Sequence, residues 1–87
     1  MKFTKRKNDS SSVRKVWDDD KTRCYGVVGT IQDLIDCGIM EYSDYDHNLW
    51  CFIPATAGAT HGAHFGKTRD EALEGIYLRL GGNSDAN

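Results

Sequence analysis

A glycine-rich stretch leads into Gly66-Lys67-Thr68, a tripeptide that phosphate-binding loops place at the start of a helix. In such loops, backbone N–H groups and a helix N-terminus gather around phosphates, and the lysine reaches them. The motif requires a glycine five residues before Gly66, but His61 stands there and the nearest glycine, Gly62, is one position away. No magnesium-binding strand is recognisable either. We therefore expect these glycines to shape a loop, with a looser anion site at Thr68 as the alternative.

His61 and His64 have the H-x-x-H spacing of a metal-binding pair. Zinc takes three or four tetrahedral ligands, and only these two are local in the sequence, so we expect two loop histidines and no metal. Cys51 with a histidine could act as nucleophile and base. It lies, however, in the most apolar stretch of the chain, where a thiolate is disfavoured. We predict a core cysteine, no enzymatic activity and no cofactor.

Three consecutive carboxylates, Asp18, Asp19 and Asp20, separate two β-prone stretches. Calcium loops space their oxygen ligands at alternate positions around a glycine, and this run does not. The sequence therefore predicts a solvated turn.

Acidic and aromatic residues interleave from Glu41 to Asn48. Tyrosine offers a large contact area at low entropy cost, and carboxylates steer basic partners. We predict a protein-binding surface that could occupy a groove meant for nucleic-acid phosphates. The alternative is a solvated hairpin whose tyrosines pack on their own sheet. The surface would comprise Asp18, Asp19, Asp20, Glu41, Tyr42, Asp44, Tyr45, Asp46, His61 and His64.

Charge is separated along the chain, although the net charge is only −2. Residues 1–15 hold six basic residues against Asp9, whereas most of the negative charge lies between Asp18 and Asp46. The polar residues 1–12 cannot bury enough surface to offset the entropy of ordering them, so the sequence predicts a flexible basic arm. An alternative site for nucleic-acid phosphates would use Lys5, Arg6, Lys7, Arg14 and Lys15.

Length and composition indicate one globular domain. Of the 87 residues, 28% are charged and 39% are hydrophobic, which is typical of a folded chain. Three cysteines without CxxC spacing favour a reducing cytosol over a disulfide framework. No secretory leader and no run of about 18 apolar residues is recognisable. We expect a cytoplasmic protein with no membrane partner.

Hydrophobic periodicity predicts an α+β domain over residues 13–82, with the element order β-β-α-β-β-α and a disordered tail over residues 83–87. Four strands would form a mainly antiparallel sheet with both helices on one face. The expected strands are 13–17, 23–28, 39–43 and 49–53. The last of these is apolar at every position, so we expect it to be the central strand, covered on both faces.

Capping residues delimit the two expected helices. Thr30 can cap a short helix that ends at Gly38, with Asp33 and Asp36 facing water. The second helix begins at a capping box formed by Thr68 and Glu71. Its apolar stripe is followed by a stop at residues 81–82, and comprises Ala72, Leu73, Ile76, Tyr77 and Leu80.

The whole chain resembles the small accessory proteins of phages and prophages. The likeness consists of one α+β domain, an acidic face, no catalytic set, and a strand followed by a T-x-x-E-A helix (Thr68, Glu71, Ala72). Such proteins, which include anti-CRISPR and host-takeover inhibitors, typically bind and block a host complex. The resemblance implies an inhibitor in a bacterial cytoplasm whose partner is a host protein or nucleoprotein complex with a basic surface. The sequence does not decide whether the protein forms a homodimer.

A second resemblance covers about a quarter of the chain. Phe52-Ile53-Pro54, Gly58 and the stretch from Gly66 to Leu73 are similar to the "P…G…G-x-T-x-x-E-A" stretch of HicB-type antitoxins. This chain has a longer loop between Pro54 and Thr68 and no recognisable added DNA-binding segment. The resemblance implies, as the alternative function, an antitoxin or a small nucleic-acid-binding protein. The loop over residues 55–67 is a second candidate contact surface.

Overall fold

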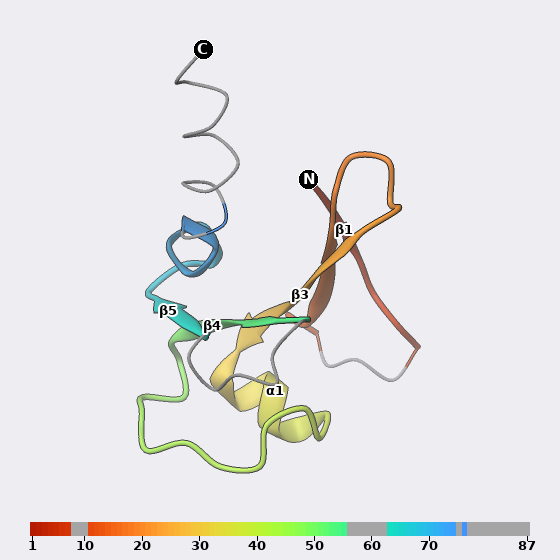
Figure 1. Ribbon diagram of the computed structural model, residues 1–87. Coiled ribbons are helices and arrows are strands. Elements are labelled where there is room, and N and C mark those ends of the chain that lie inside the picture. The colour runs from red at the N-terminus through yellow and green to blue at the C-terminus, as the bar shows by residue number, and fades with distance from the viewer. Residues whose placement is uncertain (8–10, 56–62, 75, 77–87) are drawn as a thin grey trace.

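The computed structural model describes residues 1–7, 11–55, 63–74 and 76 (Figure 1). A second helix follows the last strand, and its described residues are 69–74 and 76. The α+β class and the antiparallel sheet are confirmed, but the sheet has five strands rather than four, and the predicted element order is wrong. The elements before the second helix are β1 (Lys2–Thr4), β2 (Arg14–Trp17), β3 (Cys24–Thr30), α1 (Ile31–Asp36), β4 (Trp50–Pro54) and β5 (His64–Gly66).

The strands form one sheet whose spatial order follows the sequence, β1-β2-β3-β4-β5, with every neighbouring pair antiparallel. β4 lies inside the sheet, and its Cys51 and Phe52 are buried in different cores. The predicted coverage of this strand on both faces is confirmed, although β3 occupies the middle of the sheet.

Each face of the sheet carries its own hydrophobic core and its own helix, and Figure 1 shows α1 and the second helix on opposite sides. The prediction that both helices share one face is therefore wrong. The reason lies in the interior strands, because adjacent residues of β3 and β4 are both apolar and point to opposite faces. The core under the second helix contains Val16, Val28, Phe52, Ala72, Leu73 and Ile76. The core under α1 contains Val13, Ile31, Leu34 and Cys51.

Gly26 allows β3 to lie close to β4. Its φ is +152°, and an added Cβ would lie 2.2 Å from the carbonyl oxygen of Ile53 and 2.8 Å from the Phe52 ring. The register of β2 against β3 shifts at the same level, between Val16 and Trp17. Only glycine fits this position without moving β4.

Residues 39–43 are not a strand, contrary to the sequence prediction. The N–H groups of Ile39 and Met40 both donate to the carbonyl of Leu34, so they close the C-terminus of α1 and do not join a ladder. Their apolar side chains pack against the core under α1. Burial of these two side chains therefore needs no strand.

Two short edge strands lie where the sequence predicts an arm and a loop. Phe3 of β1 packs on the core under the second helix, and the guanidinium of Arg69 lies 4.3 Å from its ring centroid. The prediction of a flexible arm is wrong for Lys2–Thr4. At the other edge, β5 pairs with β4 through Phe65 and its neighbours. Three-residue strands are too short to show periodicity, which explains both errors.

The caps of α1 agree with the sequence, except at Asp33. The Thr30 hydroxyl accepts the N–H of Asp33 at 3.2 Å, and Gly38 ends the helix at φ +82°. The sequence predicts that the Asp33 carboxylate faces water. In the structure Asp33 is half-buried, and its carboxylate accepts from the backbone N–H of Ser12 at 3.0 Å and from the Ser12 hydroxyl. Asp33 thereby ties α1 to the residues that lead into β2.

The second helix begins at Arg69 after its Thr68 cap, as predicted. The Thr68 hydroxyl accepts the N–H of Glu71 at 3.1 Å. A Cβ on Gly66 would lie 2.4 Å from the Glu71 Cβ, so the helix lies directly against the end of β5. The predicted stripe residues Tyr77 and Leu80, the stop at 81–82, the tail and most of the 55–67 loop lie outside the described residues.

Candidate protein-binding surface

Residues 41–48, here called the acidic segment, have no regular secondary structure and are tied to α1 through His47. The N–H of Gln32 donates to the carbonyl of His47 at 3.1 Å. The Nδ1 of the ring lies 2.9 Å from the Gln32 Oε1, and the Nε2 lies 3.2 Å from the carbonyl oxygen of Ser43. α1 therefore anchors the end of the acidic segment, and His47 folds its middle back toward the helix.

Both ring nitrogens of His47 face oxygen atoms that accept hydrogen bonds. The Ser43 oxygen is a backbone carbonyl, which cannot donate. The Gln32 amide nitrogen donates to the Asp36 carboxylate at 2.9 Å, which orients the amide oxygen toward His47. His47 therefore links Gln32 of α1 to Ser43 of the acidic segment through its two ring nitrogens.

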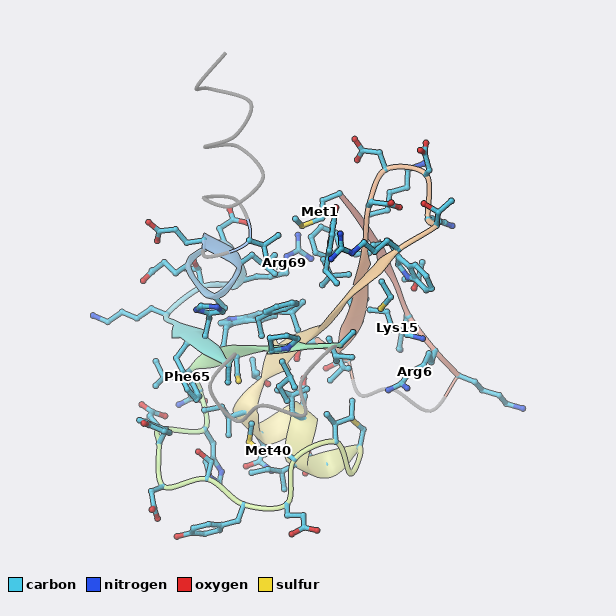
Figure 2. The ribbon with its side chains drawn as sticks, viewed as in Figure 1. Met1, Arg6, Lys15, Met40, Phe65 and Arg69 are labelled. Carbon is cyan, nitrogen blue, oxygen red and sulfur yellow. The ribbon has the colours of Figure 1, made fainter. Side chains whose placement is uncertain are left out.

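The molecule exposes three large aromatic side chains among its described residues, and all three lie in or beside the acidic segment. Tyr42 is 74% exposed, Tyr45 58% and Phe65 39%. The rings of Tyr45 and Phe65 are in contact, with centroids 4.6 Å apart and planes inclined by 36°. Phe65 lies on β5 just above the acidic segment in Figure 2. The two rings form a preassembled aromatic platform at this edge of the sheet.

Hydrogen bonds orient the carboxylates of the acidic segment without neutralising them. Asp44 accepts from the Tyr42 hydroxyl at 2.6 Å, and this bond raises the pKa of Tyr42 above its ordinary value. Asp46 accepts the N–H of Asn48 at 2.9 Å. Neither of these partners carries a positive charge.

The acidic segment lies in a long part of the sequence without lysine or arginine. None stands between Arg23 and Lys67. That interval contributes β3, α1, the acidic segment, β4 and β5 to the structure. Its carboxylates are Asp33, Asp36, Glu41, Asp44 and Asp46. The side of the molecule around the acidic segment therefore has a negative potential that its own cations do not cancel.

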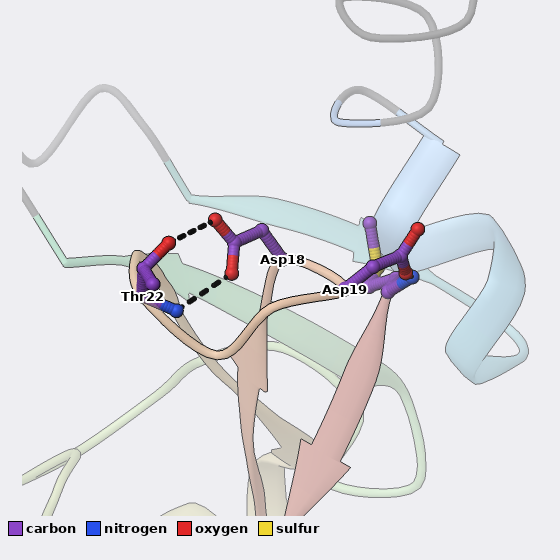
Figure 3. Close-up of polar contacts among 4 residues, drawn as sticks. Asp18, Asp19 and Thr22 are labelled. Atoms are coloured by element: carbon purple, nitrogen blue, oxygen red, sulfur yellow. Dashed lines mark hydrogen bonds and ion pairs between the residues drawn. The ribbon is translucent and has the colours of Figure 1, made fainter.

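Asp18, Asp19 and Asp20 do not join this surface. They lie in the β2–β3 turn, at the end of the molecule opposite the acidic segment (Figure 1). Asp18 closes the turn by accepting both the N–H and the hydroxyl of Thr22, each at 2.9 Å (Figure 3). Asp19 forms an ion pair with the amino group of Met1. The predicted solvated turn agrees with this arrangement, but the aspartates and the acidic segment are separate sites.

The predicted contact histidines are also not assembled with the acidic segment. His64 lies opposite Phe52 in the β4–β5 pair, and the two rings stack with centroids 6.5 Å apart. It therefore points to the face of the second helix, whereas its neighbour Phe65 points to the other face. His61 lies outside the described residues.

Cys51 is fully buried in the core under α1, as the sequence predicts. Burial raises the pKa of its thiol to about 11, so it is a neutral thiol at physiological pH. Among the residues that the structure describes, no three His, Cys, Asp or Glu side chains are grouped closely enough to hold a metal ion.

The basic residues proposed for nucleic acid divide between two faces. Lys15 lies opposite Val27, on the α1 face, whereas Arg14 lies opposite Val28, on the face of the second helix. Lys5, Arg6 and Lys7 follow β1 and are exposed. Arg14 donates to the carbonyls of Ser11 and Val13, which is a local structural role.

Phe65 is the one residue of the platform that sequence reasoning missed. It stands directly after the glycine-rich loop, and the three residues His64-Phe65-Gly66 are too few to indicate a strand. A usable signal was the presence of an isolated aromatic between the loop and the Thr68 cap. An aromatic side chain at this position lies close to the start of the helix, either in the core or on the neighbouring surface.

Comparisons with known proteins leave the chain without an assigned family. No family model matches it, and neither a curated protein nor a solved structure is similar enough to it to be a match. Within the described part of the chain, no helix has the length and apolar character needed to cross a membrane. The geometry of the surfaces therefore has to support the function by itself.

Proposed function

We propose that the protein is a non-enzymatic binding module that docks a basic surface of a host protein or nucleoprotein complex and blocks it, in the manner of a phage-type inhibitor. The observation that supports this proposal is the exposed Tyr45–Phe65 platform beside the acidic segment. Aromatic anchors surrounded by charge are the usual centre of a protein interface.

The platform and the carboxylates have different roles in this proposal. Tyr45 and Phe65 already contact one another, so a partner gains their apolar area at a small cost in side-chain entropy. Asp44 and Asp46 flank Tyr45 in the sequence and attract a basic partner over a longer range. The platform therefore supplies most of the affinity, and the carboxylates supply the association rate and the specificity.

The negative charge of the acidic segment explains how its binding would block the host surface. A host surface that binds nucleic-acid phosphates is basic, and the acidic segment presents carboxylates to the same surface. Occupation by the acidic segment excludes the nucleic acid by direct competition. The partner class is therefore a nucleic-acid-handling protein or complex.

The test compares partner capture from a bacterial lysate by the parent chain, by Tyr45→Ala and by the double variant Asp44→Asn/Asp46→Asn. Asp20→Asn is the matched control, because it removes a carboxylate from the turn at the opposite end. We expect Tyr45→Ala to weaken binding of the captured protein by about 30-fold or more. The double Asn variant should slow association and reduce its salt dependence, and Asp20→Asn should change neither quantity.

Capture alone is not sufficient support. The captured protein, once purified, must lose its own DNA or RNA when the parent chain is added, and must retain it when Tyr45→Ala is added. Circular dichroism of each variant checks that the fold is kept. If folded Tyr45→Ala captures the same protein as tightly as the parent chain, or if nucleic acid is not displaced, the proposal is wrong.

A further inference from the structure

The sheet face on the side of α1 carries a second charged surface, at the opposite edge from Phe65. Lys2 pairs with Trp17, and Thr4 pairs with Lys15, across the β1–β2 ladder. Paired residues of an antiparallel ladder point to the same face. These four side chains are here called the basic strip. They lie together on the α1 face of the sheet, opposite to the face from which Phe3 and Val16 point.

Contacts within the basic strip hold Trp17 in place. Its indole Nε1 donates to the Thr4 hydroxyl at 2.8 Å, and the Lys15 ammonium lies 5.2 Å from its ring centroid. Lys2 is directly across the ladder and exposed. The Trp17 ring thus lies beside the Lys15 ammonium on its own strand, and Lys2 is its register partner on β1. Figure 2 shows Lys15 on the side of the molecule away from Phe65.

Few negative charges oppose the basic strip. Residues 1–7 and 11–17 contain no carboxylate, and β1 is followed by two further exposed lysines, Lys5 and Lys7. The nearest carboxylates are Asp18, Asp19 and Asp20 of the β2–β3 turn, of which Asp19 is paired with the Met1 amino group. Within the basic strip, Lys2 is exposed, whereas Thr4, Lys15 and Trp17 are half-buried, so part of the indole stays open to solvent.

We propose that the basic strip binds a single strand of nucleic acid, with one base stacked on Trp17 and the flanking phosphates on Lys2 and Lys15. Single-strand binding surfaces combine aromatic platforms with basic side chains in this way. Lys2 and Lys15 are diagonal neighbours about 7–8 Å apart at the backbone, with Trp17 beside both. An anionic membrane or an acidic protein would use the lysines but would not require the flat ring.

The site predicted from the sequence is therefore changed in composition. Arg14 leaves it because it points to the other face, and Lys2 and Trp17 enter it. The proposal does not depend on the acidic segment. That segment lies at the other edge of the sheet and has the opposite charge.

The direct test is fluorescence anisotropy of a labelled oligonucleotide of mixed sequence, titrated with the full chain. With two phosphate contacts, from Lys2 and Lys15, affinity should fall about sevenfold between about 50 and about 200 mM salt. Lys2→Gln/Lys15→Gln should weaken binding at low salt and flatten the salt dependence. Lys67→Gln is the matched control, because this exposed lysine lies beyond β5, and it should bind like the parent chain.

The stacking contact is tested separately. Trp17→Ala should weaken binding about fivefold or more with an unchanged salt slope, and Trp17→Phe should restore most of the affinity. Thermal unfolding checks that both variants are folded. If Trp17→Ala does not fold, Trp17→Phe still tests the stacking contact. An abasic strand of the same length should bind the parent chain as weakly as the normal strand binds Trp17→Ala.

Three outcomes would overturn the proposal. The first is equal binding of the abasic and normal strands, which would leave only a nonspecific polyanion contact. The second is equal or tighter binding of vesicles containing phosphatidylserine, which would assign the basic strip to a membrane surface. The third is unchanged affinity in Lys2→Gln/Lys15→Gln.

Discussion

The acidic segment and the basic strip are built in different ways. The acidic segment has irregular backbone, and its shape depends on hydrogen bonds such as those that join His47 to Gln32 and Ser43. The basic strip lies on two paired strands, so the ladder between β1 and β2 fixes its side chains. A single substitution should therefore alter the acidic segment more readily than the basic strip, whose loss requires loss of the sheet.

The largest expected effect tests this dependence on the sheet. Gly26→Ala should destabilise the protein by about 4 kcal/mol, because the added Cβ meets the Ile53 carbonyl and the Phe52 ring. Gly38→Ala is the matched control at the end of α1, where an added Cβ meets nothing within 4 Å. It should cost about 1–2 kcal/mol, from its positive φ alone.

Urea unfolding of the two glycine variants measures both values. Nuclear magnetic resonance spectra of Gly38→Ala should show shifts confined to α1 and the acidic segment, with the resonances of β1 and β2 unchanged. Equal destabilisation by the two substitutions would mean that close approach of β3 and β4 does not support the sheet.

An intermediate effect is expected at Asp33, which links α1 to the approach to β2. The hydrogen bond from the Ser12 hydroxyl, with others from neighbouring groups, holds the pKa of Asp33 below its ordinary value of 3.8. A carboxyl whose pKa is lowered on folding stabilises the folded state above its unfolded pKa. Its contribution, about 1 kcal/mol for a partly solvated group, is lost as pH falls through the folded pKa.

The measurement is the free energy of unfolding of the parent chain and of Asp33→Asn between neutral pH and the acid limit of folding. The difference between the two should be present at neutral pH and should disappear as pH falls through the folded pKa of Asp33, which lies below 3.8. Asp36→Asn, on the exposed side of the same helix, should show a much smaller difference. A difference that is constant with pH would rule out the charged form of Asp33 as its source.

The smallest effect is expected within the acidic segment, at the contact between Tyr42 and Asp44. Asp44→Asn should lower the pKa of Tyr42 toward its ordinary value, because the amide no longer favours the protonated hydroxyl. Since both side chains are exposed, global stability should not change. Resonance shifts of the Tyr42 ring during an alkaline titration report the pKa, and the parent chain titrated under the same conditions is the reference.

The sequence was sufficient where a local signal and burial agreed. The Thr30 and Thr68 caps, the Gly38 stop and the buried strand around Cys51 were all predicted because each depends on neighbouring residues or on an unbroken apolar run. The opposite placement of the two helices was missed. It depends on which face each strand residue covers, and this becomes clear only when the strands are in register.

The candidate surfaces were predicted less well than the fold. The tyrosines and carboxylates of the acidic segment were identified from composition, but their neighbour Phe65 comes from another strand. Asp18 to Asp20 were assigned to the same surface because charge alone does not show position. The basic strip depends on the pairing of Lys2 with Trp17, a contact between residues that the sequence places in an arm and a strand.

The lengths of the edge strands have a consequence for behaviour at high concentration. β1 and β5 end the sheet on its two sides, and each has only three residues. An edge this short offers few free backbone groups to a strand from another molecule, and Lys2 adds charge at one of them. The longer strands β3 and β4 are enclosed between neighbours. The fold is thereby protected against edge-to-edge aggregation, and a chain that lacked β1 would lose this protection by exposing β2.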